Sequence, residues 1–186
     1  MLDLNHTERN NSSTNALTLR LKNPKLTIRQ VEKKDEPSLA NIIRAVFEEH
    51  KAPKEGTVYS DPTTDHLYDL FQNISSILWV AEMNHQIVGC CGVYPTEGLP
   101  EKTAELVKFY LSPIARGKGI GKQLMEKSIQ SAKELGYADL YLESMPQFSR
   151  AVDFYYRLGF KQLKNALGNS GHTSCSIWML LRLVDF

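Results

Sequence analysis

Residues 115–127 read "ARGKGIGKQLMEK", a glycine-rich bend that leads directly into a segment with helical spacing of its apolar residues. The start of a helix carries unpaired N–H groups and the positive end of the helix dipole, which together attract anions. Glycine also lets a ligand approach the backbone without meeting a Cβ atom. Arg116, Lys118 and Lys122 add positive charge. The stretch therefore predicts a polyphosphate site, and a connector with solvated basic residues is the alternative.

Two common nucleotide fingerprints fit this bend poorly. A P-loop has four residues between its first glycine and its Gly-Lys pair, and then Ser or Thr. Here three residues separate Gly117 from Gly121, and Gln123 follows Lys122. A Rossmann fingerprint places its third glycine three positions after the second, whereas these glycines are spaced by single residues. Only Glu143, at the end of the next expected strand, suits a dinucleotide site.

Composition sets the frame for these patterns. The 186 residues suffice for one domain, and 42% hydrophobic with 23% charged residues is ordinary for a globular protein. A net charge of +1, no long apolar run and no secretory signal give no reason to expect a nucleic-acid or membrane partner. Cys90, Cys91 and Cys175 form no disulfide or zinc pattern. We expect reduced thiols, a cytoplasmic protein and no metal.

The first half of the chain predicts a tail and then a mixed set of elements. Residues 1–23 are rich in Asn, Ser and Thr and are expected to be a mobile tail, so that the domain covers residues 24–186. Asp35 is expected to be the N-cap of the first helix. The further elements expected are a strand at 26–31, a helix over 36–49, a short helix at 67–75 and a hairpin at 77–95 that turns at Asn84 and His85.

The second half adds one crossover of the βαβ type. The expected elements are a strand at 103–112, a long helix that Gly136 closes, a strand at 138–144, a helix at 149–158 closed by Gly159, and paired strands at 160–163 and 174–183 joined by a flexible segment. The order β-α-α-β-β-β-α-β-α-β-β combines antiparallel hairpins with a single parallel connection. It predicts an α/β fold with a mixed sheet.

The stretch 103–163 resembles the GNAT-type N-acetyltransferase superfamily. Its signature, Arg/Gln-x-x-Gly-x-Gly/Ala, is matched by Arg116, Gly119 and Gly121. A second family element, Tyr-x-x-x-Gly-Phe at the end of a helix, is matched by "YYRLGF" at 155–160. The two motifs lie in the family's order, with a helix and a strand between them, and are far more specific together than singly.

This resemblance implies a fold and a co-substrate. The fold is a central, mostly antiparallel sheet of six to seven strands, with helices on both faces and two splayed parallel strands. The co-substrate is acetyl-CoA, and no metal is implied. Many members carry Asn where this chain has Phe148, which puts one side-chain contact in doubt. The cofactor-binding residues implied are Phe109, Tyr110 and Leu111 for pantetheine, and Arg116, Gly117, Lys118, Gly119, Ile120, Gly121 and Lys122 for the pyrophosphate.

Acetyl transfer to an amine requires a base, because an alkyl amine with a pKa near 10.4 is mostly protonated at neutral pH. Glu105 lies on the strand where family members often place an acid, and we expect it to act as base or to orient the acceptor. Strand alternation predicts that Glu105 shares a face with Val107, Phe109 and Leu111, and that Lys108 lies on the other face. A carboxyl in such an apolar row is expected to have a raised pKa. A simple ion pair with a lysine is the alternative.

The remaining candidates are a general acid and three acceptor-binding residues. By the resemblance, Tyr155 is expected to give a proton to the departing CoA thiolate. Glu143 is expected to face the acceptor. Tyr59 and Asp61 lie in the 52–66 loop, where this family shapes its acceptor pocket, and are suited to bind an ammonium group.

These observations predict an N-acetyltransferase that moves an acetyl group to a primary amine of a small molecule or protein by direct attack in a ternary complex. The alternative is a non-catalytic acyl-CoA-binding sensor of the same fold. The family also suggests a homodimer as a possible assembly, through exchange of the apolar C-terminal strands.

Overall fold

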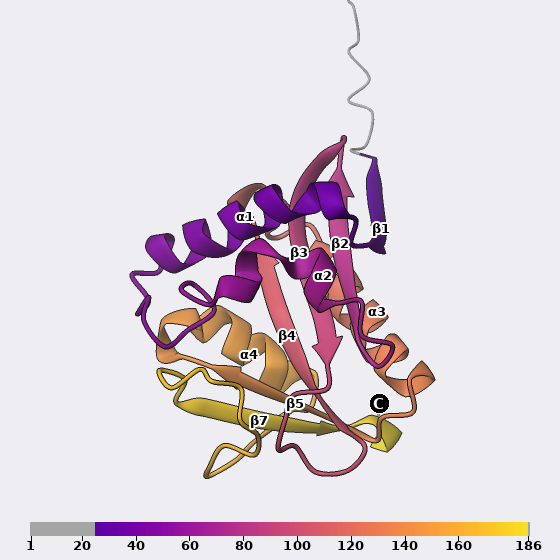
Figure 1. Cartoon of the computed structure of the whole chain (residues 1–186), viewed down its shortest axis with the longest axis vertical. Helices are drawn as coiled ribbons and strands as arrows, with labels where there is room; N and C mark the ends of the chain where they lie inside the picture. The colour runs from indigo at the N-terminus through magenta and orange to yellow at the C-terminus, as the bar shows by residue number, and fades with distance from the viewer. Residues whose placement is uncertain (1–24, 186) are drawn as a thin grey trace, which may run out of the picture.

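The computed structural model describes residues 25–185, so the expected tail at 1–23 lies outside the described residues. One seven-stranded sheet runs through the domain in the order β1-β2-β3-β4-β5-β7-β6 (Figure 1). Only β4 and β5 are parallel, and they are joined by a helical crossover. The predicted mixed fold class is confirmed. The strands are β1 (Leu26–Gln30), β2 (Ile77–Met83), β3 (Gln86–Tyr94), β4 (Thr103–Leu111), β5 (Asp139–Ser144), β6 (Lys161–Gln162) and β7 (Ile177–Arg182).

Helices cover both faces of this sheet. Helices α1 (Glu36–Glu49) and α2 (Leu67–Leu70) pack with Val80 and Cys90 on one face. Helices α3 (Ile120–Glu134) and α4 (Ser149–Arg157) pack on the other face, and α3 lies behind the strands in Figure 1. The predicted order of helices and strands is therefore confirmed. None of the described helices has the length and apolar character needed to cross a bilayer.

Short-range sequence signals set the turns of this fold. Asn84 and His85 both have positive φ, 51° and 64°, as the predicted two-residue hairpin turn requires. Gly136 and Gly159 have φ of 86° and 93° just after α3 and α4, where they end the helices as predicted.

The residues before α1 differ in detail from the prediction. Asp35 precedes the helix, but its side chain caps none of the helix's N–H groups. Its buried carboxylate instead accepts hydrogen bonds from Arg29, at 2.7 and 2.9 Å, and from the backbone N–H of Glu32, at 2.8 Å. Arg29 also donates to Glu82 on β2. This network ties β1, β2 and the start of α1 together.

The two parallel strands separate part-way along their length. The last register pair between β4 and β5 is Glu105 with Tyr141. Beyond it β5 stays paired with β7 as far as Ser144, whereas residues 106–111 of β4 have no strand partner on this side within the described residues. This divergence is the splay that the family resemblance implied, and it leaves one edge of β4 without ladder hydrogen bonds.

A β-bulge in β4 overturns the predicted alternation. Lys108 and Phe109 both lie opposite the single residue Cys91 of β3, and Lys108 has a φ of 54°. The extra residue reverses which side chains face which way. Phe109 and Leu111 pack against α3 and α4 rather than sharing a face with Glu105. The ammonium of Lys108 reaches the loop after α1. The prediction of one continuous face was wrong because a bulge has no signature in the strand's periodicity.

The fully buried Leu124 on α3 provides a test of the core. Leu124→Ala is expected to lower the free energy of unfolding by about 2–5 kcal/mol, because it removes apolar contacts and leaves a cavity. Leu135→Ala is the matched control, since Leu135 is 38% exposed at the end of the same helix, and we expect it to cost less than about 1.5 kcal/mol. Urea unfolding measures both. Equal losses would contradict this packing.

Candidate active site

The glycine bend lies at the start of α3 and faces a cavity of about 850 Å³. A Cβ atom added to Gly117 or Gly119 would meet nothing within 4 Å, and their φ values are 73° and 75°. Among the described residues, no backbone N–H from 117 to 122 donates to a backbone carbonyl. Several N–H donors and the positive helix end are thus available to an anion. The side chain of Ile120 is buried in the core, so this residue offers only its backbone.

The partly exposed side chain of Arg116 is held by other parts of the protein. Its guanidinium donates to both carboxylate oxygens of Glu49, at 2.6 and 2.7 Å, and to the carbonyl of Leu111, at 3.2 and 3.1 Å. Its backbone N–H donates to Pro113. The side chain therefore fixes the glycine bend against the end of β4 and the end of α1. The predicted partner of this side chain was a phosphate, and no local pattern indicated Glu49, which lies 67 positions away.

The larger cavity occupies the space where β4 and β5 separate. Tyr155 is buried on the side of this cavity that α4 forms. The centroid of its ring lies 6.0 Å from that of Phe109 and 5.8 Å from that of Phe160. Burial raises the pKa of Tyr155 well above its usual range, so its hydroxyl stays protonated. Phe148, at the position where many family members have Asn, packs on Phe47 at 5.2 Å. Further residues that line the cavity include Phe109, Tyr110, Leu111, Arg116, Gly121, Lys122 and Glu143.

Glu105 lies at the point of divergence. It is 4% exposed and accepts a hydrogen bond of 2.5 Å from the hydroxyl of Thr96. Burial, with a smaller contribution from nearby Glu143, raises the pKa of Glu105 to about 7. The raised pKa agrees with the prediction. A carboxyl with this pKa accepts and releases a proton readily at neutral pH.

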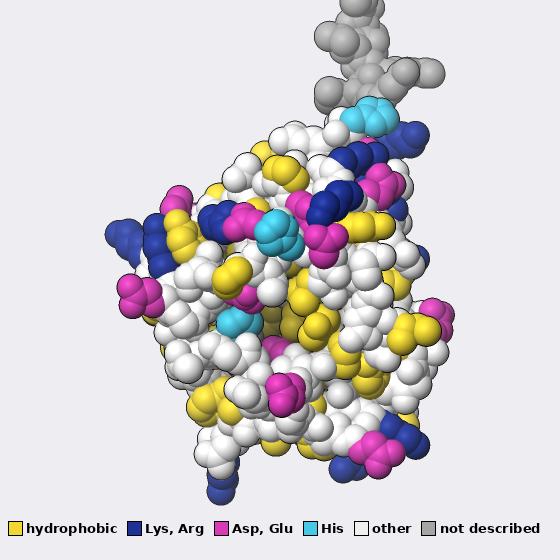
Figure 2. All heavy atoms as spheres, in the orientation of Figure 1, with side chains coloured by type: hydrophobic (Ala, Val, Ile, Leu, Met, Phe, Trp, Pro, Cys, Tyr) yellow, Lys and Arg dark blue, Asp and Glu magenta, His cyan; other side chains and the backbone are white. Residues whose placement is uncertain are grey.

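A smaller cavity of about 500 Å³ lies between the loop segments 56–63, 94–97 and 169–172. Figure 2 shows a hollow over β4, with an apolar floor and with histidine and acidic side chains at its edge. The loops are joined by backbone hydrogen bonds, including Asn169 to Glu97 at 2.8 Å. Glu105 and Lys108 line both cavities, so β4 contributes to the wall between them.

Two residues of this wall were missed from the sequence. Lys108 is 6% exposed, and its Nζ lies 3.5 Å from Oδ2 of Asp61. His172 places its Nε2 3.6 Å from the same oxygen. The His172 ring, with weaker help from Lys108, holds the pKa of Asp61 well below its usual range, while burial lowers the pKa of Lys108. Strand alternation, which the bulge breaks, had placed Lys108 on the face opposite Glu105. The glycine-rich segment around His172 has no feature apart from the histidine that marks it as part of a site.

The three predicted acceptor-binding residues differ in position. Asp61 lines the smaller cavity, and Glu143 lines the larger one, where it accepts from Tyr141 at 2.7 Å and from Ser170 at 2.8 Å. Tyr59 lines neither cavity, and its hydroxyl donates to Glu48 at 2.9 Å. The structure thus brings Asp61 and Glu143 to the candidate site, but not Tyr59.

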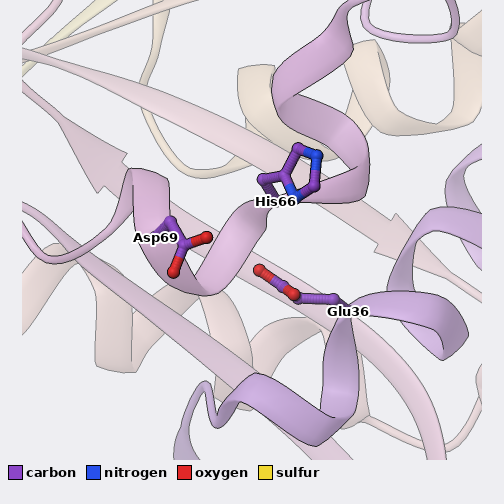
Figure 3. A group of neighbouring side chains, drawn as sticks. All are labelled: Glu36, His66 and Asp69. Atoms are coloured by element: carbon purple, nitrogen blue, oxygen red, sulfur yellow. The ribbon is translucent and has the colours of Figure 1, made fainter.

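A second group of acidic and histidine side chains lies outside this site. Glu36, His66 and Asp69 come together where α1 starts and α2 lies (Figure 3). The ammonium of Lys33 lies 3.2 Å from Glu36 and 2.6 Å from Asp69. This ammonium forms ion pairs with both carboxylates, so the group is an ion-pair cluster that links the start of α1 to α2.

Comparison with known proteins adds an independent line of evidence. The family model described as "Acetyltransferase (GNAT) family" matches residues 43–160. The uncharacterized N-acetyltransferase YjgM of Escherichia coli K12 is 34% identical over 157 residues, which cover 84% of this chain and 94% of that protein.

Two solved structures show the same fold. An acetyltransferase of the GNAT family from Staphylococcus aureus Mu50 has a TM-score of 0.75 at 23% identity, over 86% of this chain and 99% of its own. YncA from Salmonella typhimurium, solved with its cofactor acetyl-CoA, has a TM-score of 0.67 at 22% identity, over 86% of this chain and 94% of its own.

The buried carboxyl of Glu105 predicts a pH-dependent effect on stability. Its pKa rises on folding from an ordinary value of 4.5 to about 7. The folded state holds the proton more tightly, so stability falls as pH rises between these values. Glu105→Gln is therefore expected to raise the free energy of unfolding by up to roughly 3 kcal/mol at pH 8.5, and by much less at pH 5. Urea unfolding at both pH values measures the difference.

The control for this measurement is Glu101→Gln, on the exposed β3–β4 connection. It is expected to change stability by less than about 0.5 kcal/mol at either pH. A gain for Glu105→Gln that is the same at pH 5 and pH 8.5 would rule out a raised pKa as its cause.

Proposed function

The chain belongs to the GNAT acetyltransferase family, and we propose that it transfers an acetyl group from acetyl-CoA to a primary amine of a small molecule or protein. The observation that carries this proposal is the open edge of β4, with the glycine bend at one end and Glu105 at the other. An extended amide-bearing chain pairs with such an edge, and a pyrophosphate binds the N–H groups at a helix start. Acetyl-CoA combines both features with a thioester that activates the acetyl carbon.

In this proposal, backbone groups hold most of the cofactor. The N–H groups at 117–122 bind the pyrophosphate, with Lys122 at the cavity wall adding positive charge. The edge of β4 at 109–111 pairs with the pantetheine amides. Arg116 acts as a positioning residue, because its guanidinium is paired with Glu49 at the wall of the larger cavity and fixes the bend there.

Glu105 is the proposed base. With a pKa of about 7, it is partly ionised at neutral pH and receives the proton that an alkylammonium must lose before it attacks the acetyl carbon. The acceptor enters through the smaller cavity, where the carboxylate of Glu97 favours a cationic amine, while that of Asp61 is paired with Lys108 and His172. Glu143, close to Glu105, faces the acceptor from the β5 side.

Tyr155 is the proposed acid. Its buried hydroxyl remains protonated across the physiological range and lines the larger cavity beside Phe109. It donates a proton or hydrogen bond to the CoA sulfur as the thiolate departs. The attack is direct, so the side chains of this site orient groups and move protons without forming a covalent intermediate.

Cofactor binding is tested with a matched pair of glycine variants. Gly119→Glu places a carboxylate in the open space beside the bend and is expected to weaken acetyl-CoA binding at least about 100-fold by charge repulsion and obstruction. Gly136→Glu is the control, because Gly136 also has positive φ and open space but lies at the far end of α3. Calorimetry measures both. Equal weakening by the two variants, or a wild type that binds neither acetyl-CoA nor CoA, would refute the proposed pyrophosphate site at the glycine bend.

Catalysis is tested with a panel of primary amines: ethanolamine, 1,4-diaminobutane, L-lysine and a short peptide with a free N-terminus. Tyr155→Phe is expected to lower kcat by about 10²-fold while acetyl-CoA affinity is retained, because only the proton donor is lost. Tyr156→Phe, half-exposed on the same helix, is expected to keep full activity. Thiol release measures turnover. Tight acetyl-CoA binding with no turnover of any amine would favour the non-catalytic sensor.

A further inference from the structure

The proposed reaction has a proton to dispose of. When an alkylammonium is acetylated, a C–N bond forms, the C–S bond breaks, and the nitrogen loses two protons. One proton ends on the CoA sulfur, and the other must leave to solvent in each turnover. Glu105 receives that second proton in the proposed function, on which this inference rests. Glu105 lines both cavities, but only 4% of its surface is exposed, so a more exposed titratable neighbour would give the proton a faster route to solvent.

Most neighbours of Glu105 are poorly suited to this task. Thr96 donates its only hydroxyl proton to the carboxylate and has no ordinary titration near neutral pH. Lys108 is paired with Asp61. Burial raises the pKa of Cys175 to about 12, so its thiol stays protonated.

The β5 side of Glu105 offers no better route. Glu143 accepts hydrogen bonds from the hydroxyls of Tyr141 and Ser170, which occupy both of its oxygens. Burial, followed by the hydrogen bond to Glu143, raises the pKa of Tyr141 well above its usual range. The buried Tyr110, on β4, also has a raised pKa because of burial. Neither tyrosine exchanges a proton readily at neutral pH.

His172 has the geometry that the others lack. One of its ring nitrogens lies within 4.8 Å of a carboxylate oxygen of Glu105 and one of Glu143. This separation is spanned by a single water molecule. Its Nε2 is buried and has no hydrogen-bond partner among the described residues, and it lies 3.6 Å from Oδ2 of Asp61. The ring lines both cavities, so it extends from the base to the cavity through which solvent enters.

We infer that His172, oriented by Asp61, carries the acceptor's proton from Glu105 to the solvent of the smaller cavity. The imidazole takes the proton through one water, and Asp61 stabilises the imidazolium that forms. The imidazolium then releases the proton to solvent, which restores both groups. Imidazole is the side chain whose ordinary titration near neutrality suits this exchange. Both residues act through Glu105 and are therefore positioning and relay groups rather than groups that touch the substrate.

The kinetic test compares His172→Asn with wild type from pH 6.5 to 9.5, using the panel amine that turns over fastest. At pH 7 the variant is expected to lose about 10- to 100-fold in kcat/KM. The loss should shrink to less than about threefold at pH 9.5, where more of the amine arrives without the extra proton. Added imidazole should restore part of the activity at pH 7. A loss that stays constant across this pH range and ignores imidazole would overturn the relay.

Two further variants separate the relay from structural damage. His85→Asn, in the exposed hairpin turn, is the matched control and should keep wild-type activity at every pH. Asp61→Asn should reproduce the pH-dependent loss of His172→Asn, and the double variant should lose little more than either single variant, because one pathway is removed in each. Fully additive losses would assign the two residues independent roles and contradict the proposal.

A third measurement needs no acceptor, so it stays decisive if the proposed function fails. The ring ¹⁵N signals of His172 are followed by NMR from pH 5 to 9, with His172→Asn as the assignment standard. Glu105→Gln should move the midpoint of this titration to lower pH by at least about 0.5 unit, because it removes a nearby negative charge. Glu101→Gln should leave it in place. An unchanged midpoint in Glu105→Gln would overturn the proposed coupling between His172 and Glu105. Failure of the wild type to bind acetyl-CoA would contradict only the cofactor assignment.

Discussion

The divergence of β4 from β5 after the Glu105–Tyr141 pair is the constraint on which the rest of the site depends. Up to that pair, β4 is an interior strand with neighbours on both sides. Beyond it, one row of its backbone groups has no strand partner in the described domain. Such an edge must be covered or filled. The larger cavity, the bend before α3 and the buried Tyr155 on α4 are all arranged around this one opening.

On its polar side, the opening is lined by buried ionisable side chains. Glu105 and Lys108 are both almost fully buried, and an isolated charge there would be strongly unfavourable. Asp61 lies within 4 Å of both Lys108 and His172, and Glu105 takes a hydroxyl from Thr96. These partners come from the loops after α1, after β3 and before β7. The ion pairs and the hydrogen bond that compensate these buried charges thus join the loops to β4 at the place where an acceptor would enter.

The sequence predicted what is encoded locally. Apolar spacing located the helices and strands, and Asn84, Gly136 and Gly159 marked turns that the structure confirms. It also placed Glu105 correctly at a buried position with a raised pKa. Two of the misses depend on long-range contacts. Arg116 pairs with Glu49 across 67 positions, and the relevance of His172 depends on a loop that packs against Asp61. No window of neighbouring residues contains either pair.

The bulge at Lys108 exchanges the faces of the sheet to which the odd-numbered and even-numbered side chains of β4 point. Before it, odd-numbered residues such as Glu105 face α1; after it, odd-numbered Phe109 and Leu111 face α3 and α4, and even-numbered Tyr110 faces α1. A mutational library designed on strict alternation would target the acceptor side of β4 correctly only before the bulge. After the bulge, the same design would change residues that pack in the core on the opposite face. Alignments of related strands carry the same hazard, because a gap placed one residue away from the bulge exchanges the two faces for every position that follows.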